Sequence, residues 1–490
     1  MQPSNLETVI ENTVQRAMQA WNVPGLALVV VKDDQIILAK GYGVRETGKA
    51  QPVDEHTLFA IGSNTKAFTA TALGLLVRDG AVAWDDPVSK YLPDFRLYDE
   101  HATQMITLRD LLCHRAGLGT WAGDVLLYSS YSAEEIVRRM RHIPPSYGFR
   151  AGFGYSNLMF IAAGLVISSV SGLSWEDFIQ QRIFAPAGMR DSVASPRLFG
   201  DRQNIAVPHE DVQGKLQTVA YRDDVNVGAA GSICASVADF SRWLRLQLNG
   251  GSLDGSQIVA AEIIAETHTA HTPMRISDAE KKLFPTRHFS AYGLGWFLND
   301  IHGRLTIRHT GGVDGMLSST VLIPEEKIGI AVFSNKLPNS AFSLLPHTLV
   351  DHLLGAAPRD WLQTYLDLDK EGKQAAQQAQ MTREQARAAG TQPSLPLEKY
   401  VGSYDSLVLG GAAVSLAEGG LQIQLAVNPS IRGSLSHWHY DTFLCKWDDP
   451  VLGESLVPFI GDGQGQVREI RLRIREDWID PLEHVFTKAG

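Results

Sequence analysis

The sequence predicts an α+β domain followed by a smaller C-terminal antiparallel β-barrel. A chain of 490 residues with 44% hydrophobic residues can bury more than one core, so two domains are the expected number. Residues 370–389 are almost entirely polar or alanine, and glycine and proline in residues 390–394 break that pattern. We therefore predict an α+β domain over 1–355, a helical linker over 356–392 and a barrel over 393–490.

The first predicted elements are an amphipathic helix and a hairpin. Between Met1 and Ala20 the apolar side chains recur on one face, as in a helix that packs on a core. The residues on this face are Leu6, Val9, Ile10, Val14, Ala17 and Met18. The apolar run from Pro24 to Val31 and the run from Gln35 to Leu38 are joined by two aspartates, which predicts a hairpin.

Ser63 and Lys66 stand where a polar turn gives way to a mostly apolar run from Ala67 to Val77. If Ser63 opens a helix, the i, i+3 spacing places Lys66 on the same face one turn later. The positive potential of the helix N-terminus favours an alkoxide and, with partial burial, lowers the pKa of Lys66. The pair is therefore predicted to be a nucleophile and its base. Ser-x-x-Lys alone is weak evidence, because it arises about once by chance in a chain of this length.

Two later triplets strengthen this interpretation. Tyr155-Ser156-Asn157 follows a glycine-rich turn, and His309-Thr310-Gly311-Gly312 follows the strand-like segment from Arg304 to Arg308. With Ser63 and Lys66 they form three widely spaced motifs. This arrangement resembles the serine beta-lactamase and penicillin-binding protein superfamily, whose other members carry S-x-x-K, S-D-N and K-T-G. The tyrosine in the second motif resembles the branch of class C beta-lactamases, DD-peptidases, D-aminopeptidases and related esterases.

The resemblance extends over roughly residues 20 to 340 and implies a fold. Further segments that look like the family are Gly41 to Arg45, Thr107 to Leu118, Ala187 to Met189, Gly228 to Ser232, Tyr292 to Trp296 and Ser334-Asn335. The implied catalytic domain is an α/β sandwich with an all-helical lobe. In the family, the tyrosine motif lies at the lip of this lobe and the third motif on an edge strand across the cleft.

The resemblance also implies a role for each catalytic residue. Ser63 attacks a carbonyl carbon, while Lys66 and Tyr155 share the proton and titrate as a unit. Tyr155 later protonates the leaving group, and water hydrolyses the acyl-enzyme. The backbone N–H groups of Ser63 and Gly312 form the oxyanion hole.

The remaining implied site residues bind the substrate. Asn157 is expected to hold Lys66 and the substrate amide, and His309 and Gly311 to line the opposite wall. The family's lysine in the third motif is replaced by His309, a neutral imidazole at pH 7 that supplies little charge. Recognition of a substrate carboxylate is therefore weakened, and Tyr155 should be less acidic. No cofactor or metal is expected.

The resulting prediction is a serine hydrolase that acts on amide bonds of small peptides, including peptides with D-residues. A carboxylesterase with the same residues is the alternative. Beta-lactamase action is disfavoured by His309, and a catalytically silent penicillin-binding-like scaffold is disfavoured by the intact Ser63, Lys66, Tyr155 and Asn157.

Composition excludes several other classes. The net charge of −10, without a basic run, argues against nucleic acid and anionic membrane surfaces. No apolar stretch is long enough to span a bilayer, and the N-terminus lacks the regions of a signal peptide. The cysteines are odd in number and far apart, which predicts buried thiols: Cys113, Cys234 and Cys445. A cytoplasmic protein is expected, although a leader already removed would leave the same sequence.

The barrel prediction rests on short, often alternating segments separated by turns. They are Tyr400 to Tyr404, Ala412 to Ala417, Leu421 to Leu425, Ser434 to Tyr440, Thr442 to Lys446, Leu456 to Ile460, Val467 to Ile474 and His484 to Thr487. This region resembles the lipocalin-like domain appended to some family members. We expect it to narrow the cleft or build a homo-oligomer rather than to carry its own ligand. The pairs His437 with His439 and His268 with His271 offer too few ligands for a metal site, and the second pair is expected at a solvated helix end.

Overall fold

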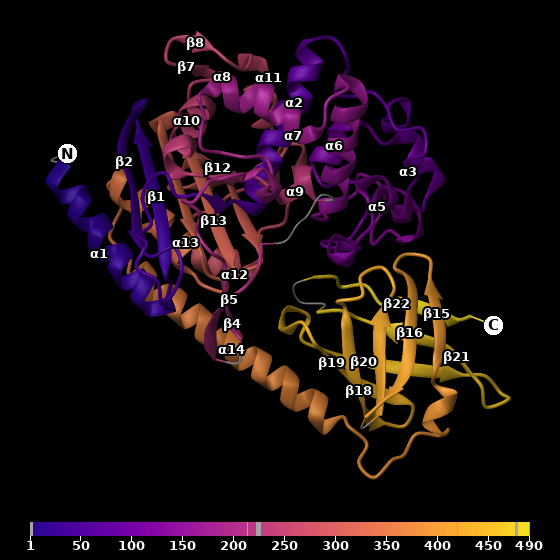
Figure 1. Ribbon diagram of the computed structural model, residues 1–490. Coiled ribbons are helices and arrows are strands. Elements are labelled where there is room, and N and C mark those ends of the chain that lie inside the picture. Colours follow the sequence, from indigo (N-terminus) through magenta and orange to yellow (C-terminus); the bar gives the residue numbers. More distant parts are fainter. Residues whose placement is uncertain (1–2, 213, 222–226, 419, 476–478, 490) are drawn as a thin grey trace.

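The computed structural model describes residues 3–212, 214–221, 227–418, 420–475 and 479–489. A sheet sandwiched between helices and a separate barrel make up this part of the chain, and a long helix joins them (Figure 1). The predicted fold class, a beta-lactamase-like α+β domain with an antiparallel barrel, is confirmed.

The catalytic domain is built on an antiparallel sheet whose described strands follow the order β2-β1-β14-β13-β12-β11-β10-β9. These strands are β1 (Gly25–Lys32), β2 (Gln35–Gly43), β9 (Thr272–Pro273), β10 (Ser290–Tyr292), β11 (Phe297–Ile301), β12 (Arg304–Val313), β13 (Met316–Ile323) and β14 (Ile328–Ser334). The predicted hairpin is β1 and β2, and Asp33 and Asp34 make its turn with φ of 51° and 63°. Both faces of β1 are buried, which explains its unbroken apolar run.

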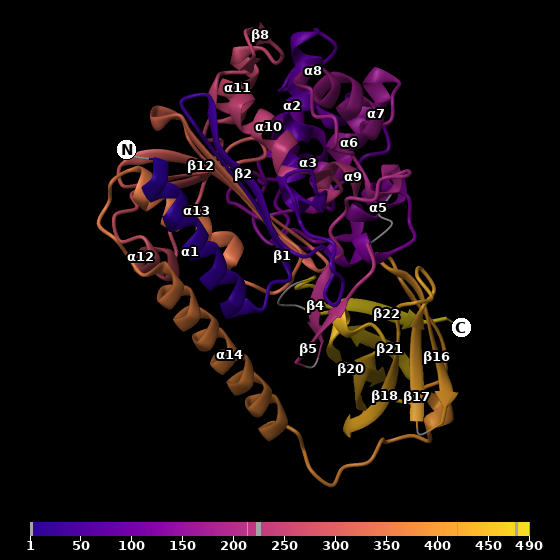
Figure 2. The ribbon, with the colours of Figure 1, turned by 60° about the vertical axis from the view of Figure 1, so that its left-hand side comes forward.

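One face of the sheet is covered by the two ends of the catalytic domain. The predicted N-terminal helix is α1 (Pro3–Trp21), and it packs beside α13 (Ala341–Leu353) as Figure 2 shows. Leu6, Ile10 and Val14 of α1 are buried there, together with Leu26 and Leu28 of β1. The predicted apolar face of α1 is therefore the face that contacts the core. The short helix α12 (Asp278–Leu283) lies on the same side.

The other face of the sheet carries α2, α10 and the helical lobe. The lobe centres on α6, which is apolar all round and buried against its neighbours, as expected for a helix inside a core. Helices on this side are α2 (Thr65–Arg78), α3 (Glu100–Met105), α4 (Leu108–Leu112), α5 (Ala133–Arg139), α6 (Asn157–Ser171), α7 (Trp175–Ile179), α8 (Ala185–Ala187), α9 (Gly228–Gly231), α10 (Val237–Leu248) and α11 (Ala261–Thr267). Small two-stranded sheets are β3 (Phe59–Ala60) with β6 (Cys234–Ala235), β4 (His209–Val212) with β5 (Lys215–Thr218), and β7 (Ser252–Leu253) with β8 (Ser256–Gln257).

The C-terminal strands close into an antiparallel barrel, because β15 pairs with both β16 and β22. The strands are β15 (Gly402–Ser406), β16 (Gly410–Ala417), β17 (Gly420–Leu425), β18 (Arg432–His439), β19 (Thr442–Trp447), β20 (Glu454–Gly461), β21 (Val467–Leu472) and β22 (His484–Lys488). Each predicted segment corresponds to one of them, and edge-to-face contacts among Tyr400, Phe443 and Phe459 fill part of the interior.

The barrel also packs on the helical lobe. Helix α14 (Trp361–Gln385) begins against the sheet and ends near the barrel, where Arg383 pairs with Glu454 at 2.9 Å. Buried apolar residues of the barrel form one cluster with those of the lobe.

Among the described residues, no single helix is long and apolar enough to cross a membrane, and only the pair Asn157–Ser171 and Trp175–Ala187, bent by 77°, meets that test together.

Candidate active site

Ser63 lies in a short 3-10 turn (Gly62–Asn64) directly before α2, so the α-helix begins at Thr65 and not at Ser63, the predicted start. This turn presses against the end of β12. A Cβ on Gly311 would lie 1.9 Å from the carbonyl oxygen of Ile61, and one on Gly62 would lie 2.8 Å from the nitrogen of Gly312. The glycines therefore allow the nucleophile turn and the third motif to meet backbone to backbone.

Lys66 is fully buried and has three close polar neighbours. Its Nζ lies 2.9 Å from Ser63 Oγ, 2.6 Å from Asn157 Oδ1 and 2.8 Å from the carbonyl oxygen of Ala230. Burial lowers the pKa of Lys66 to about 7, and the nearby Asp124 opposes this shift. A neutral amine has two N–H groups, which match the two oxygens of Asn157 and Ala230, and one lone pair, which is left for the Ser63 hydroxyl.

Asn157 begins α6, and its orientation is set by a residue that the motifs did not reveal. Its Nδ2 donates to Asp124 Oδ2 at 2.6 Å, which turns its Oδ1 toward Lys66. Asp124 is 4% exposed and lies at the start of a 3-10 turn in the lobe. No sequence motif marks Asp124, because its role depends on a contact between segments far apart in the chain.

Tyr155 lies against both members of the Ser63 and Lys66 pair. Its ring centroid is 4.9 Å from Lys66 Nζ, and a hydrogen bond links its hydroxyl to Ser63. Burial holds the pKa of Tyr155 well above its usual value, so the phenol keeps its proton. This agrees with the expected lower acidity of Tyr155. The His114 ring packs on Tyr155 at 4.3 Å, and its Nδ1 accepts from the Ser156 N–H at 3.1 Å, which positions the second motif.

His309 is buried and its ring is fully engaged by protein groups. Its Nδ1 donates to the Thr310 carbonyl at 2.6 Å, and its Nε2 lies 3.0 Å from the Tyr292 hydroxyl. Burial, with repulsion from Lys66, lowers the pKa of His309 to about 3. The imidazole is therefore neutral, as expected, but its titration is moved far below the usual range.

The third motif does not lie on an edge strand, which corrects that expectation. Strand β12 lies between β13 and β11 inside the sheet. Its pairing with β11 ends where Arg308 faces Phe297, so residues 309–313 pair only with β13. This local opening is what allows the Ser63 turn to approach Gly311 and Gly312.

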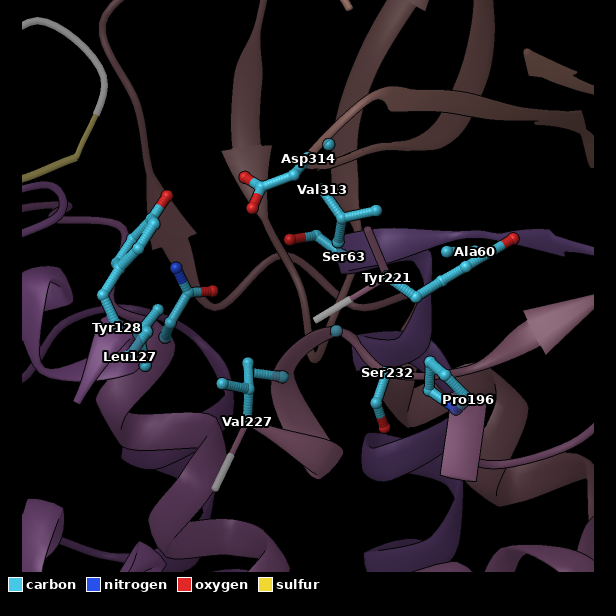
Figure 3. A pocket seen from close by; sticks show the side chains of 14 residues that line it. Ala60, Ser63, Leu127, Tyr128, Pro196, Tyr221, Val227, Ser232, Val313 and Asp314 are labelled. Atoms are coloured by element: carbon cyan, nitrogen blue, oxygen red, sulfur yellow. The ribbon is translucent and has the colours of Figure 1, made fainter. Parts of the chain in front are cut away.

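A cavity of about 130 Å³ opens beside Ser63 (Figure 3). Asn157, Gly312 and Ala230 line it, whereas His309, Gly311 and Tyr155 do not. The rest of the lining is largely apolar: Ala60, Leu127, Tyr128, Pro196, Tyr221, Val227 and Val313, with Gly231, Ser232 and Asp314. Among the described lining residues there is no lysine, arginine or histidine.

Other predicted features fall outside this cavity. Arg115, within the family-like segment Thr107 to Leu118, pairs with the buried Asp110 at 2.5 Å, and Arg150 pairs with the same carboxylate at 2.6 Å. The cysteines are free and buried, as predicted. The described residues contain no group of three or more His, Cys, Asp or Glu side chains that could hold a metal ion.

The two histidine pairs have separate structural partners. His268 packs edge-on against Trp296 and His271 contacts Glu266 at 3.1 Å, so this pair is half-buried rather than solvated. A bulge separates His437 from His439. His437 Nε2 lies 2.9 Å from the Tyr440 carbonyl, and His439 Nδ1 accepts from Ala388 at 3.2 Å.

The beta-lactamase family model matches residues 10–354. The chain belongs to the beta-lactamase family. A second model, a domain of unknown function called DUF3471, matches residues 386–484, which include most of the barrel. The resemblance predicted from the three motifs is thus confirmed, and the family consists mostly of serine hydrolases.

Similar proteins include the unguisins hydrolase ungD of Aspergillus violaceofuscus (strain CBS 115571), which is 30% identical over 81% of this chain and 75% of its own. Protein flp of Staphylococcus aureus (strain MW2) is 26% identical over 71% of this chain and 65% of its own. The octameric penicillin-binding protein homologue from Pyrococcus abyssi has the same fold, with a TM-score of 0.62 and 23% identity over 99% of this chain and 100% of that one.

Proposed function

We propose that this protein is a serine hydrolase that cleaves amide bonds of small peptides through an acyl-enzyme on Ser63. The observation that carries the proposal is the set of distances around Lys66 Nζ. Two fixed oxygens, of Asn157 and Ala230, take up both N–H groups of a neutral amine. Its lone pair is then directed to Ser63 Oγ at 2.9 Å, which is the geometry of a general base.

Lys66 takes the proton of Ser63 as the hydroxyl oxygen attacks the substrate carbonyl. The oxyanion that forms lies near the N–H groups of Ser63 and Gly312, and such donors each contribute about 3 kcal/mol. Tyr155, which keeps its proton because of burial, donates it to the departing nitrogen. The Lys66 ammonium then returns a proton to Tyr155, beside which it lies, so Lys66 is neutral again. Lys66 accepts a proton from water as the water oxygen attacks the acyl carbonyl, and the Ser63 oxygen takes that proton as the acyl group departs as a carboxylic acid.

The protonated Tyr155 favours amides over esters as substrates. An amine must gain a proton to leave, whereas an ester alkoxide leaves more readily without one. The neutral His309 and the largely apolar cavity also fit an acyl group without a carboxylate. A carboxylesterase uses the same residues and is the second outcome of the substrate test. The relative's name, an unguisins hydrolase, supports hydrolytic action without defining the substrate here.

The test is covalent labelling by a fluorophosphonate probe, followed by turnover of a matched ester and amide. The wild type should be labelled once, at Ser63, and Ser63→Ala should lose both labelling and turnover. The Ser63 side chain caps no helix, so the free energy of unfolding of this variant should lie within about 1 kcal/mol of the wild-type value. Turnover retained by Ser63→Ala would disprove the assignment, and faster turnover of the ester alone would replace amidase by esterase.

We also propose that the protein assembles into a homo-oligomer that involves the barrel. The support is the octameric penicillin-binding protein homologue, which has the same fold along its whole length. Light scattering on the full chain measures this directly, and a monomer at micromolar concentration would contradict it.

A further inference from the structure

The barrel contacts a segment of the helical lobe that also borders the nucleophile. This segment runs from Asp124 to Ser130, and its Leu127 and Tyr128 line the cavity. The N–H of Ser130 donates to the carbonyl of Val427 at 3.0 Å, and Asn428 Nδ2 donates to the carbonyl of Tyr128 at 2.8 Å. The barrel is therefore hydrogen-bonded to the segment that forms one wall of the cavity.

A third contact brings a barrel carboxylate to the backbone of the residue that follows Asp124. Asp480 Oδ2 accepts from the N–H of Val125 at 3.4 Å. Asp480 is fully buried and is held in place by His484 Nε2 at 3.0 Å and by the N–H of Leu482 at 2.9 Å. Contacts within the barrel thus fix the position of the Asp480 carboxylate, which faces the lobe.

Asp124, the neighbour of Val125, has only half of its carboxyl group satisfied. Its Oδ2 accepts from Asn157, but its Oδ1 is buried without a hydrogen-bond partner among the described residues. A carboxylate in that position is costly, because one charged oxygen is buried without a hydrogen bond, and the backbone N–H of Asn157 offsets only part of the cost of burial. A protonated carboxyl group avoids this cost and still accepts the hydrogen bond from Asn157 through Oδ2.

We propose that Asp480 is a positioning residue of the active site: its charge keeps Asp124 uncharged, so that Asp124 orients Asn157 while Lys66 stays a neutral base. This inference rests on the proposed function, in which Lys66 accepts the proton of Ser63. It assigns to the barrel a direct effect on the chemistry, in addition to the expected roles in access and assembly.

The electrostatics of the site agree with this geometry. Burial is the main cause that raises the pKa of Asp124 to about 8; the Asp480 carboxylate acts in the same direction, and the hydrogen bonds from Asn157 oppose it. Lys66 acts in the opposite direction on Asp124. The groups that face Lys66 are Asp124, the Tyr155 ring, His114 and His309, and the last two carry no charge at neutral pH because burial lowers the pKa of both.

The sign of the effect follows from this arrangement. Without the charge of Asp480, Asp124 ionises at a lower pH. An ionised Asp124 stabilises the ammonium form of Lys66, so the pKa of Lys66 rises. The fraction of neutral base near pH 7 then falls, and it recovers only at higher pH.

The experiment measures kcat/KM against pH for a small neutral amide, in the full chain, with the rate of fluorophosphonate labelling at Ser63 as a second readout. In Asp480→Asn the acidic limb should move to higher pH by about half a unit or more, so both rates should fall about threefold at pH 6.5 and recover near pH 9. The residue at position 124 cannot ionise in Asp124→Asn. The double variant Asp124→Asn with Asp480→Asn should therefore have the same acidic limb as Asp124→Asn alone.

Asp462→Asn is the control, since it removes a barrel carboxylate that pairs with Arg468 at 2.6 Å and accepts from Gln464 and Gln466 in a turn. Its limb should coincide with that of the wild type. The single variant Asp124→Asn tests the inference even if Asp480→Asn fails to fold. The acidic limb of its pH profile should stay in place or move to lower pH. A move to higher pH would overturn the inference.

The outcomes separate the two proposals. If the wild type is labelled and its limb lies near pH 7, but Asp480→Asn has the same limb, Asp480 has no positioning role and the proposed function stands. If the wild type is neither labelled nor active on amides and esters, the proposed function fails and the role of Asp480 fails with it.

Discussion

At the scale of single residues, Lys66 sets the working pH of the site. Its pKa of about 7 places the change from ammonium to amine at neutral pH, whereas the pKa of Tyr155 is too high for that residue to lose its proton there. In the proposed mechanism Tyr155 therefore keeps its proton, and Lys66 acts as the base. We expect kcat/KM to rise with pH through a single limb near pH 7, and Lys66→Ala to lose a hundredfold or more, measured by initial rates from pH 5 to 9.

The buried His309 leads to a second prediction at this scale. A glutamine amide cannot titrate, and its oxygen can accept the hydrogen bond from the Tyr292 hydroxyl that His309 Nε2 accepts. Because the pKa of His309 is about 3, the limb near pH 7 should remain in this variant. Its disappearance in the pH profile would show that His309, and not Lys66, titrates there.

The substitution His309→Lys tests whether position 309 can reach the substrate. It would place a second amine beside Lys66 in a buried site, where repulsion and burial both disfavour an ammonium. Turnover of neutral amides should drop, and penicillin acylation should improve only if the new side chain reaches the cavity. The ratio of the two acylation rates measures this, and an unchanged ratio would show that position 309 is out of reach of the substrate.

At the scale of elements, the site depends on the contact between the turn before α2 and the end of β12. The Cβ of Gly311→Ala would overlap the carbonyl oxygen of Ile61, so these two segments must separate. We expect this variant to lose about 1–3 kcal/mol of unfolding free energy and most of its turnover. The control is Gly372→Ala in α14, where an added Cβ meets nothing within 4 Å and should slightly stabilise the helix. Equal stability and rates in both variants, from denaturant unfolding and kinetics, would contradict the close approach.

At the scale of the whole molecule, the barrel and the helical lobe share one buried cluster. A chain that ends at Gly390 would expose the apolar lobe surface now covered by the barrel and would leave residues 124–130 without Val427, Asn428 and Asp480. We expect it to have lower turnover, altered selectivity and a changed association state, as determined by kinetics and light scattering. A folded fragment with the size, rate and selectivity of the full chain would mean that the barrel has no role at the site.

The sequence by itself determined the features that depend on local order along the chain. The spacing of Ser63 and Lys66 predicted their contact because one helical turn sets it, and the face of α1, the hairpin of β1 and β2 and the strands of the barrel followed from periodicity and turn residues. Motif order and resemblance also predicted the fold family and the contact between Lys66 and Asn157.

Only the tertiary structure decided the features that depend on contacts between distant segments. Strand order placed β12 inside the sheet, and burial removed the titration of His309 from neutral pH. Asp124 and Asp480 are 356 residues apart, and neither lies in a motif. Their proposed effect on Lys66 arises because folding buries two carboxyl groups and one amine near one another, and interactions between buried charges are much stronger than in water.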